Sequence, residues 1–213
     1  MTRIALATAM AMEAADADEE LLTEHLPNAE LAAWDDPTVD WSRLDIVVLR
    51  STWNYTDHLD AFLEWIDRVS SVSRLVNPAT VVRWNTDKRY LGQLAKAGIP
   101  VVPTVYVEPG DEVPAESLTG HVVVKPTVGA GSKGAALFRD NAVAAAAHLK
   151  ELHNDGRVAM VQPYLDGVDA DGETALIYIG GEFSHAARKA AILSKEMSWS
   201  SGLYADEKVV PTT

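Results

Sequence analysis

A lysine followed by three closely spaced glycines is the segment of this sequence best suited to chemistry. Lys125 ends an apolar run, and Gly129, Gly131 and Gly134 follow before the next apolar run begins. Glycines let backbone N–H groups approach oxygen atoms closely, and successive amides form an anion-binding concavity. The segment therefore predicts a phosphate site; the alternative is a glycine-rich hairpin with an exposed lysine. Because Lys125 precedes the glycines, the segment is not a Walker loop.

A second lysine, Lys88, is expected in the first turns of a helix over 86–98, with Thr86 and Asp87 as its caps. A lysine opposes the helix dipole at that end unless an anion is present. Lys88 is therefore a second candidate for an anion site. The alternative is a solvated lysine on an amphipathic helix.

Polar groups also cluster where a strand predicted over 157–165 ends. Gln162 and Tyr164 lie at that end, and an acidic loop then leads through Glu173 into another strand. A strand exit offers backbone N–H and C=O groups that can read the edge of a base, and a carboxylate can bind ribose hydroxyls. The alternative is a polar loop that only joins two strands.

Strand and helix patterns alternate over the first third of the chain, which predicts a three-layer α/β unit around a parallel sheet. Strands are expected at 4–8, 29–34 and 45–51, helices at 16–26 and 57–69, and the segment 75–77 closes the unit. Such sheets bind ligands beyond the carboxyl ends of their strands.

The residues that follow the third of these strands are candidates for binding a substrate. Arg50 can fork a carboxylate, while Thr52, Trp53 and Tyr55 can orient the molecule that carries it. The alternative is a helix entry capped by Thr52 or Asn54, with the two rings packed in the core.

The rest of the chain is richer in strand patterns and predicts a small α+β module. Strands are expected at 101–107, 121–128, 135–138 and 157–165, with a helix at 141–152. Two final strands within 173–193 are expected to join at Gly180 and Gly181, a favourable tight-turn pair.

Composition excludes several classes of function. The formal net charge of −13 argues against a nucleic-acid partner, because phosphate neutralisation needs a surplus of lysine and arginine. The chain has no cysteine, which excludes disulfides and a cysteine nucleophile and fits a cytoplasmic location. The apolar stretch at 4–12 is too short to span a membrane, and a buried strand is a better interpretation than a signal peptide. We therefore expect no membrane partner.

The lysine, glycine and strand-exit segments, in this order, resemble the ATP-grasp superfamily of glutathione synthetase, D-alanine–D-alanine ligase and the ribosomal-protein glutamate ligases. The resemblance runs from about residue 86 to about residue 191. The segments 49–55, 75–78, 84–91 and 183–191 are similar to the subgroup that contains the O-ureido-serine cyclo-ligase of D-cycloserine biosynthesis.

The resemblance implies an α/β protein with an ATP-grasp fold in three parts. These are an N-terminal three-layer α/β domain on the substrate side (1–82), a small α+β lid subdomain (83–164) and the incomplete start of a C-terminal grasp domain (165–213). Family members continue well beyond this point, so we expect a truncation or fragment rather than a degenerate relative.

The resemblance also implies a nucleotide site with a role for each matching residue. Lys88 and Lys125 would bind the α- and β-phosphates, under a mobile flap formed by Gly129, Gly131, Ser132 and Gly134. The adenine hinge would be formed, largely through backbone groups, by Gln162, Tyr164 and Leu165, and Glu173 would hold the ribose. Arg188 would act catalytically on the γ-phosphate or an acyl phosphate.

The activity implied by the resemblance is an ATP-dependent ligase or cyclo-ligase that activates a carboxyl- or ureido-type group of a small amino-acid-like substrate. The implied cofactors are ATP and Mg²⁺, but no metal ligands are identified, because no asparagine follows Glu173. The alternative function is a non-catalytic or degenerate ATP-binding module. The resemblance also allows a homodimer.

Overall fold

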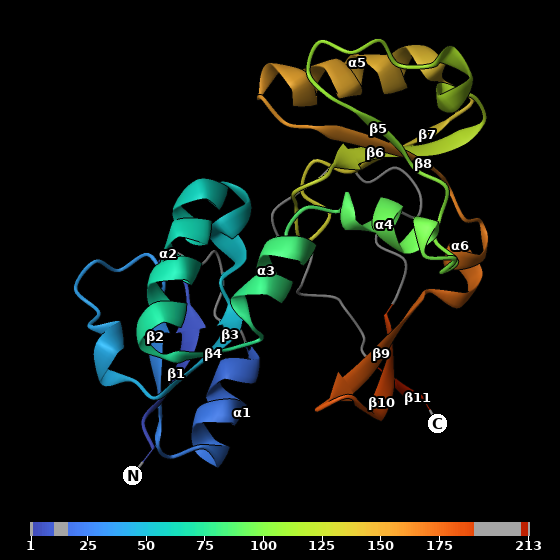
Figure 1. Cartoon of the computed structure of the whole chain (residues 1–213). Coiled ribbons are helices and arrows are strands. Elements are labelled where there is room, and N and C mark those ends of the chain that lie inside the picture. Colours follow the sequence, from blue (N-terminus) through green and yellow to red (C-terminus); the bar gives the residue numbers. More distant parts are fainter. Residues whose placement is uncertain (1, 11–16, 190–209, 213) are drawn as a thin grey trace. The chain divides into compact units, whose positions relative to one another are not determined.

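The computed structural model describes residues 2–10, 17–189 and 210–212, and the chain divides into two compact units, residues 1–90 and 91–213 (Figure 1). The first unit contains a parallel sheet of four strands in the order β2-β1-β3-β4. Its strands are β1 (Ile4–Thr8), β2 (Ala29–Ala33), β3 (Ile46–Ser51) and β4 (Arg74–Val76). The predicted parallel sheet is confirmed.

The core of the first unit is formed by the sheet and by α2 (Leu59–Val72). Phe62, Trp65, Ile66 and Val69 recur at helical spacing, so one face of α2 is apolar and becomes buried. Burial of each such side chain contributes roughly 1.5–3 kcal/mol to the free energy of unfolding. The smaller helix α1 (Ala17–His25) agrees with the helix predicted over 16–26, as far as the described residues extend.

The helix predicted over 86–98 begins later than expected. Helix α3 (Ala79–Asn85), which the sequence patterns did not predict, is followed by a turn at 86–89 and then by α4 (Tyr90–Lys96). Thr86 ends α3, and its Oγ1 donates to the Arg83 carbonyl at 3.2 Å. The Asp87 carboxylate accepts the N–H of Arg89 at 2.9 Å, a local turn that competes with helix. Thr86 therefore does not cap α4.

The second unit contains an antiparallel sheet in the order β5-β8-β6-β7, with α5 (Ala142–Asn154) on one of its faces (Figure 1). Its strands are β5 (Val105–Val107), β6 (His121–Pro126), β7 (Ala136–Arg139) and β8 (Ala159–Pro163). Strand β5 is shorter than the predicted 101–107, because Pro103 has no N–H to donate to a ladder. A 3-10 helix (Ala115–Leu118) completes the core under α5.

The chain then forms a short helix, α6 (Gly167–Asp171), and a second antiparallel sheet of the order β11-β10-β9. Strands β9 (Glu173–Ile179) and β10 (Glu182–Lys189) join at Gly180 and Gly181, whose φ angles are +63° and +87°. Two successive positive φ angles are what a tight hairpin turn requires, so the predicted turn is confirmed. Strand β11 (Val210–Thr212) pairs with β10. Residues 190–193 of the predicted strands lie outside the described residues.

Candidate functional site

Lys125 and Gln162 lie on the same face of the sheet in the second unit. Val124 and Val161 belong to the core under α5, and side chains alternate along a strand, so Lys125 and Gln162 face the other way. The ladder pairs Lys125 with Met160, and pairs Val123 with Gln162. Lys125 and Gln162 are therefore diagonal neighbours on adjacent strands, a spacing of roughly 7–8 Å.

Helix α4 lies against this same face of the sheet (Figure 1). Tyr106 pairs with Met160 and so shares the Lys125 face. A Cβ atom added at Gly92 of α4 would lie 3.7 Å from Cε2 of Tyr106, which places the helix in contact with the ring. One face of the sheet thus packs on α5, and the other presents polar groups beside α4.

Lys125 is held partly out of water at this face. Burial lowers the pKa of its ammonium group, and the nearby Glu173 carboxylate opposes that shift. A lysine in such a place gains more from an arriving anion than a solvated lysine does, because little water remains to be displaced. Lys125 and Glu173, two of the predicted nucleotide-site residues, therefore act on one another electrostatically.

The glycine-rich segment forms the loop at 127–135 that connects β6 and β7. Thr127, at its base, is buried and donates its N–H to the Val158 carbonyl at 2.9 Å. Two tight turns follow, with Lys133 N–H donated to Ala130 O at 3.1 Å and Ala135 N–H donated to Ser132 O at 2.9 Å. The base of the loop is therefore fixed to the sheet.

Gly134 closes this loop in a conformation that suits only glycine. Its φ is +73°, and an added Cβ would lie 3.3 Å from Cδ of Pro126. Its carbonyl accepts a hydrogen bond from Nε2 of His148 on α5 at 2.9 Å. Gly131 and Ser132 also have positive φ, at +57° and +59°, so the chain reverses sharply over the middle of the loop.

The side chain of Gln162 is buried and oriented by a neighbour. Its Nε2 donates to Oγ1 of Thr104 at 2.8 Å, and Thr104 Oγ1 donates in turn to the Val102 carbonyl at 2.8 Å. Thr104 immediately precedes β5, the strand beside β8. Sequence reasoning missed Thr104, because local patterns do not show which residue of another strand lies beside Gln162.

Tyr164 is engaged in structural contacts. Its N–H donates to the His121 carbonyl at 2.8 Å, its hydroxyl donates to Asp169 of α6, and the Arg139 guanidinium lies 5.3 Å from the centre of its ring. Burial and the hydrogen bond to Asp169 raise the pKa of the hydroxyl to about 12. The Leu165 N–H, by contrast, has no hydrogen-bond partner within the described part of the chain. The Leu165 N–H, unlike that of Tyr164, is therefore left to donate to a ligand.

Glu173 and Arg188 lie on the same hairpin but on opposite faces. Arg188 of β10 pairs with Thr174 of β9, and Thr174 is adjacent to Glu173 in the strand. Directly opposed residues share a face, whereas successive residues alternate. The structure therefore does not bring Arg188 to the face of the hairpin that carries Glu173.

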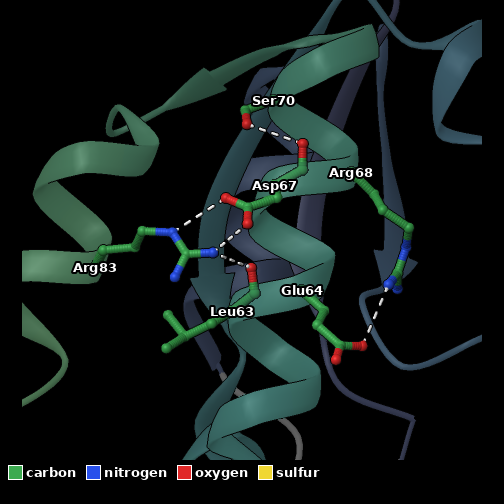
Figure 2. Close-up of polar contacts among 6 residues, drawn as sticks. All are labelled: Leu63, Glu64, Asp67, Arg68, Ser70 and Arg83. Carbon is green, nitrogen blue, oxygen red and sulfur yellow. Dashed lines mark hydrogen bonds and ion pairs between the residues drawn. The ribbon is translucent and has the colours of Figure 1, made fainter.

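Lys88 lies in the turn at 86–89 of the first unit. This turn follows α3, which is held to α2 by the hydrogen bonds of Arg83. Figure 2 shows the guanidinium of Arg83 on α3 directed at α2. Arg83 Nε donates to Asp67 at 3.0 Å, and Nη2 donates both to Asp67 and, at 2.9 Å, to the Leu63 carbonyl. A separate ion pair, between Glu64 and Arg68 at 4.0 Å, lies within α2 itself.

The predicted substrate residues around the end of β3 differ in their surroundings. Thr52 is buried and Tyr55 packs 5.2 Å from the Phe62 ring, as the alternative interpretation expected for a ring in the core. Trp53 is 47 % exposed. Thr52 stands at the N-cap position of a 3-10 helix (Trp53–Thr56) but makes no side-chain capping bond, and α2 begins later, at Leu59. Arg50 lies at the end of β3, half-buried.

Asn54 instead connects the ends of the parallel strands. Its Oδ1 accepts from Nε1 of Trp34 at 2.7 Å, and its Nδ2 donates to Asp35 at 2.7 Å. Asp35 also accepts the N–H of Met10 at 2.8 Å. The loops after β1, β2 and β3 are thereby joined at the carboxyl edge of the sheet, where α/β proteins bind ligands.

A cavity of about 460 Å³ lies beside this network, between α2 and the segment that follows β2. Trp34, Asp35, Trp41, His58 and Trp65 are among its lining residues. The four predicted substrate residues do not line it.

Comparison with known proteins identifies the family. A family model described as the N-terminal domain of D-cycloserine synthetase DcsG matches residues 4–77. The cycloserine biosynthesis protein DcsG of Streptomyces lavendulae is 42 % identical over 174 residues, which are 78 % of this chain and 58 % of that protein. The crystal structure of D-cycloserine synthetase DcsG matches 98 % of this chain and 72 % of its own length, with 37 % identity and a TM-score of 0.81. The chain belongs to the D-cycloserine synthetase family.

Structures with lower sequence identity share the fold of this chain. The D-alanine–D-alanine ligase of Bacillus anthracis, solved with ATP, matches the whole chain and 71 % of its own length, at 12 % identity and a TM-score of 0.62. A RimK-domain ATP-grasp protein of Sphaerobacter thermophilus matches 88 % of this chain and 72 % of its own, at 21 % identity and a TM-score of 0.63. The predicted ATP-grasp fold is confirmed.

The described residues offer neither a metal-ligand cluster nor a helix able to span a membrane. Residues 2–10, 17–189 and 210–212 contain no cluster of three or more carboxylate or imidazole groups able to hold a metal ion. The same part of the chain has no helix long and apolar enough to cross a bilayer.

Proposed function

We propose that this chain carries the nucleotide-binding part of an ATP-dependent ligase or cyclo-ligase that acts on a small amino-acid-like substrate. The observation that carries the proposal is the shared sheet face of Lys125 and Gln162, beside a glycine-rich loop. The 42 % identity to a cycloserine biosynthesis protein supports the choice of reaction class. The chain spans 58 % of that protein, so the activity is proposed for the full-length product.

Lys125 and the loop at 127–135 would bind the phosphates. The partly desolvated ammonium group supplies positive charge, and the amides of the loop supply hydrogen-bond donors. Phosphoryl transfer is catalysed mainly by positioning and by neutralising charge on the transferred group, and needs no protein nucleophile. Lys88 and Arg188 are further cations proposed for the phosphates.

Gln162 and Leu165 would recognise the base. The Leu165 N–H can donate to a ring nitrogen, while the Oε1 atom of Gln162 can accept from an exocyclic amino group. Tyr164 would contribute its carbonyl group, because its N–H and hydroxyl are used within the protein. Glu173, close enough to Lys125 to influence its pKa, would bind the ribose hydroxyls.

The proposed reaction has two steps. An oxygen of the carboxyl or ureido group attacks the γ-phosphorus of ATP, the bond to the β,γ-bridging oxygen breaks, and ADP leaves. A nitrogen then attacks the activated carbon, loses its proton, and expels inorganic phosphate, which carries away the oxygen. Mg²⁺ remains a prediction, and neither the base nor the phosphate contacts above depend on it.

The substrate would bind at the carboxyl edge of the parallel sheet. Arg50 is proposed to fork its carboxylate, with Thr52, Trp53 and Tyr55 around it. The network centred on Asn54 would hold this edge in place. A cytoplasmic location and a homodimer are proposed with the enzyme, while nucleic acid and membrane are not proposed as partners.

The test is ATP-dependent release of ADP and phosphate by the full-length protein that contains this chain, against a panel of amino acids and ureido-amino acids. We expect release with at least one ureido- or carboxyl-bearing amino acid. ATP binding without release on any substrate would instead favour the non-catalytic module. Absence of ATP binding would overturn both functions.

A further inference from the structure

The hydrogen-bond chain behind Gln162 has a direction. A threonine hydroxyl has a single hydrogen, and Thr104 Oγ1 gives it to the Val102 carbonyl at 2.8 Å. The same oxygen can then only accept from Gln162, which lies 2.8 Å away. The group of Gln162 that faces Thr104 must therefore be the donor, Nε2. The reverse orientation would bring two acceptors together or take the hydroxyl away from Val102.

This direction determines what Gln162 presents to a ligand. With Nε2 held by Thr104, the end of the amide left for a ligand is Oε1, which accepts no hydrogen bond from the described residues. The side chain lies on the polar face of the sheet, on the strand beside Lys125. A bound nucleotide base thus meets an acceptor whose orientation is fixed from behind.

We propose that Thr104 is a positioning residue that fixes the Gln162 amide and thereby selects a 6-aminopurine nucleotide over a 6-oxopurine nucleotide. This inference rests on the proposed nucleotide site. An adenine amino group donates to Oε1, whereas the oxygen of hypoxanthine would face it as a second acceptor. Without the Thr104 hydroxyl the amide can turn over, and Nε2 can then donate to the 6-oxo group.

The test compares the dissociation constants of ATP and ITP by calorimetry on the whole chain. ITP is the suitable probe because it carries the 6-oxo group without the 2-amino group of guanine. We expect the wild-type chain to prefer ATP by about tenfold or more, the typical effect of one hydrogen bond gained or lost. Thr104→Val, which keeps the shape but removes the hydroxyl, should reduce the preference to about threefold or less. Thr104→Ser should retain it.

A double-mutant cycle separates this role from a merely structural one. Gln162→Glu places acceptors at both ends of the side chain, so its preference for ATP should no longer depend on Thr104. Thr104→Val should therefore leave the ATP-to-ITP ratio unchanged in the Gln162→Glu background. This comparison remains informative if Thr104→Val lowers stability, because a structural defect would weaken the binding of ATP and of ITP to the same extent.

The outcomes are distinguishable. If the wild-type chain binds neither nucleotide, the proposed site is wrong and the inference fails with it. If the wild type prefers ATP but Thr104→Val keeps the full preference, only the inference is wrong. Equal wild-type affinity for ATP and ITP would also overturn it while leaving nucleotide binding intact.

Discussion

At the scale of the residue, Lys125 combines partial burial with a position on the polar sheet face. Its ammonium group has a pKa lowered by burial from the ordinary value of 10.5, with Glu173 opposing the shift. In the window between the lowered pKa and 10.5, the unfolded chain binds more protons than the folded chain, so folding stability rises with pH there. A phosphate would favour the charged form and raise the pKa again.

The first prediction concerns this lysine. Lys125→Ala should weaken ATP binding about ten- to hundredfold, because a charge-assisted hydrogen bond is lost. The wild-type affinity should fall as the pH rises from about 8, where the phosphates are fully ionised, toward 10.5, because binding then requires proton uptake by Lys125. Lys125→Arg should remove this pH dependence, since arginine stays charged. Calorimetry across the pH range checks both; equal profiles for wild type and Lys125→Arg would contradict the assignment.

The second prediction separates the two reasons for glycine at position 134. Gly120 also has φ of +73°, yet an added Cβ there would meet nothing within 4 Å among the described residues. Gly120→Ala should therefore lower the free energy of unfolding only through backbone strain, by about 1–2 kcal/mol. Gly134→Ala should cost more, because its Cβ would also press on Pro126 at 3.3 Å. Only Gly134→Ala should weaken ATP binding.

Denaturant unfolding and calorimetry on both variants measure these effects. An equal loss of stability in the two variants would show that the contact with Pro126 is unimportant. Unchanged ATP affinity in a folded Gly134→Ala variant would remove the loop from the phosphate site.

At the scale of the element, α3 connects the body of the first unit to the turn that carries Lys88. Arg83 and Asp67 form a two-pronged contact between α3 and α2, although both side chains are partly exposed, at 40 % and 63 % (Figure 2). Exposed pairs contribute little to stability, typically 0–1 kcal/mol. This contact therefore serves mainly to position α3 and the turn that follows it, rather than to add stability.

The third prediction tests that role. Arg83→Lys keeps the charge but loses the fork, so it should destabilise the first unit by only about 0.5–1 kcal/mol. If Lys88 binds phosphate, the same change should weaken ATP binding several-fold by loosening the turn. Glu64→Gln is the matched control, since it breaks an ion pair that stays within α2. An equal effect of both variants on ATP affinity would show that the α3 contact has no special role.

The elements also show how far the sequence alone can lead. Apolar runs predicted β1, β3, β6 and β8 well, because burial on both faces of a strand leaves a continuous local pattern. The break between α3 and α4 was missed, since it depends on the Asp87 side chain bonding its own backbone turn. The shared face of Lys125 and Gln162 required the register between strands, and register joins residues that are far apart in the sequence.

At the scale of the whole molecule, the chain divides into two compact units, residues 1–90 and 91–213. Lys88 belongs to residues 1–90, whereas Lys125, Gln162 and Glu173 belong to residues 91–213. A ligand that binds only the folded chain stabilises it by about 2.7 kcal/mol at one hundred times its dissociation constant. Most of that gain should appear in the second unit.

The fourth prediction follows from this division. Saturating ATP should slow amide hydrogen exchange in β6, β8 and the loop at 127–135, because opening of these segments would require the nucleotide to leave. Exchange in β1 and β3, inside the first unit, should change much less. Mass spectrometry of peptides from both units measures the difference. Equal protection of β1 and β6 would contradict a site built mainly on the second unit.

The alternation along β6 has a consequence for how the gene can change. Val122 and Val124 complete the core under α5, while Lys125 points to the opposite side. Removing a single codon within this strand would exchange the residues that face α5 with those on the opposite face of the sheet. An ammonium group would then enter the core, and a valine would take its place on the ligand face. Such a deletion preserves the reading frame, but the one-residue slip would abolish folding and nucleotide binding together. Insertions in the exposed segment at 108–112 touch neither group of residues, so length variation among natural relatives should accumulate there rather than in β6.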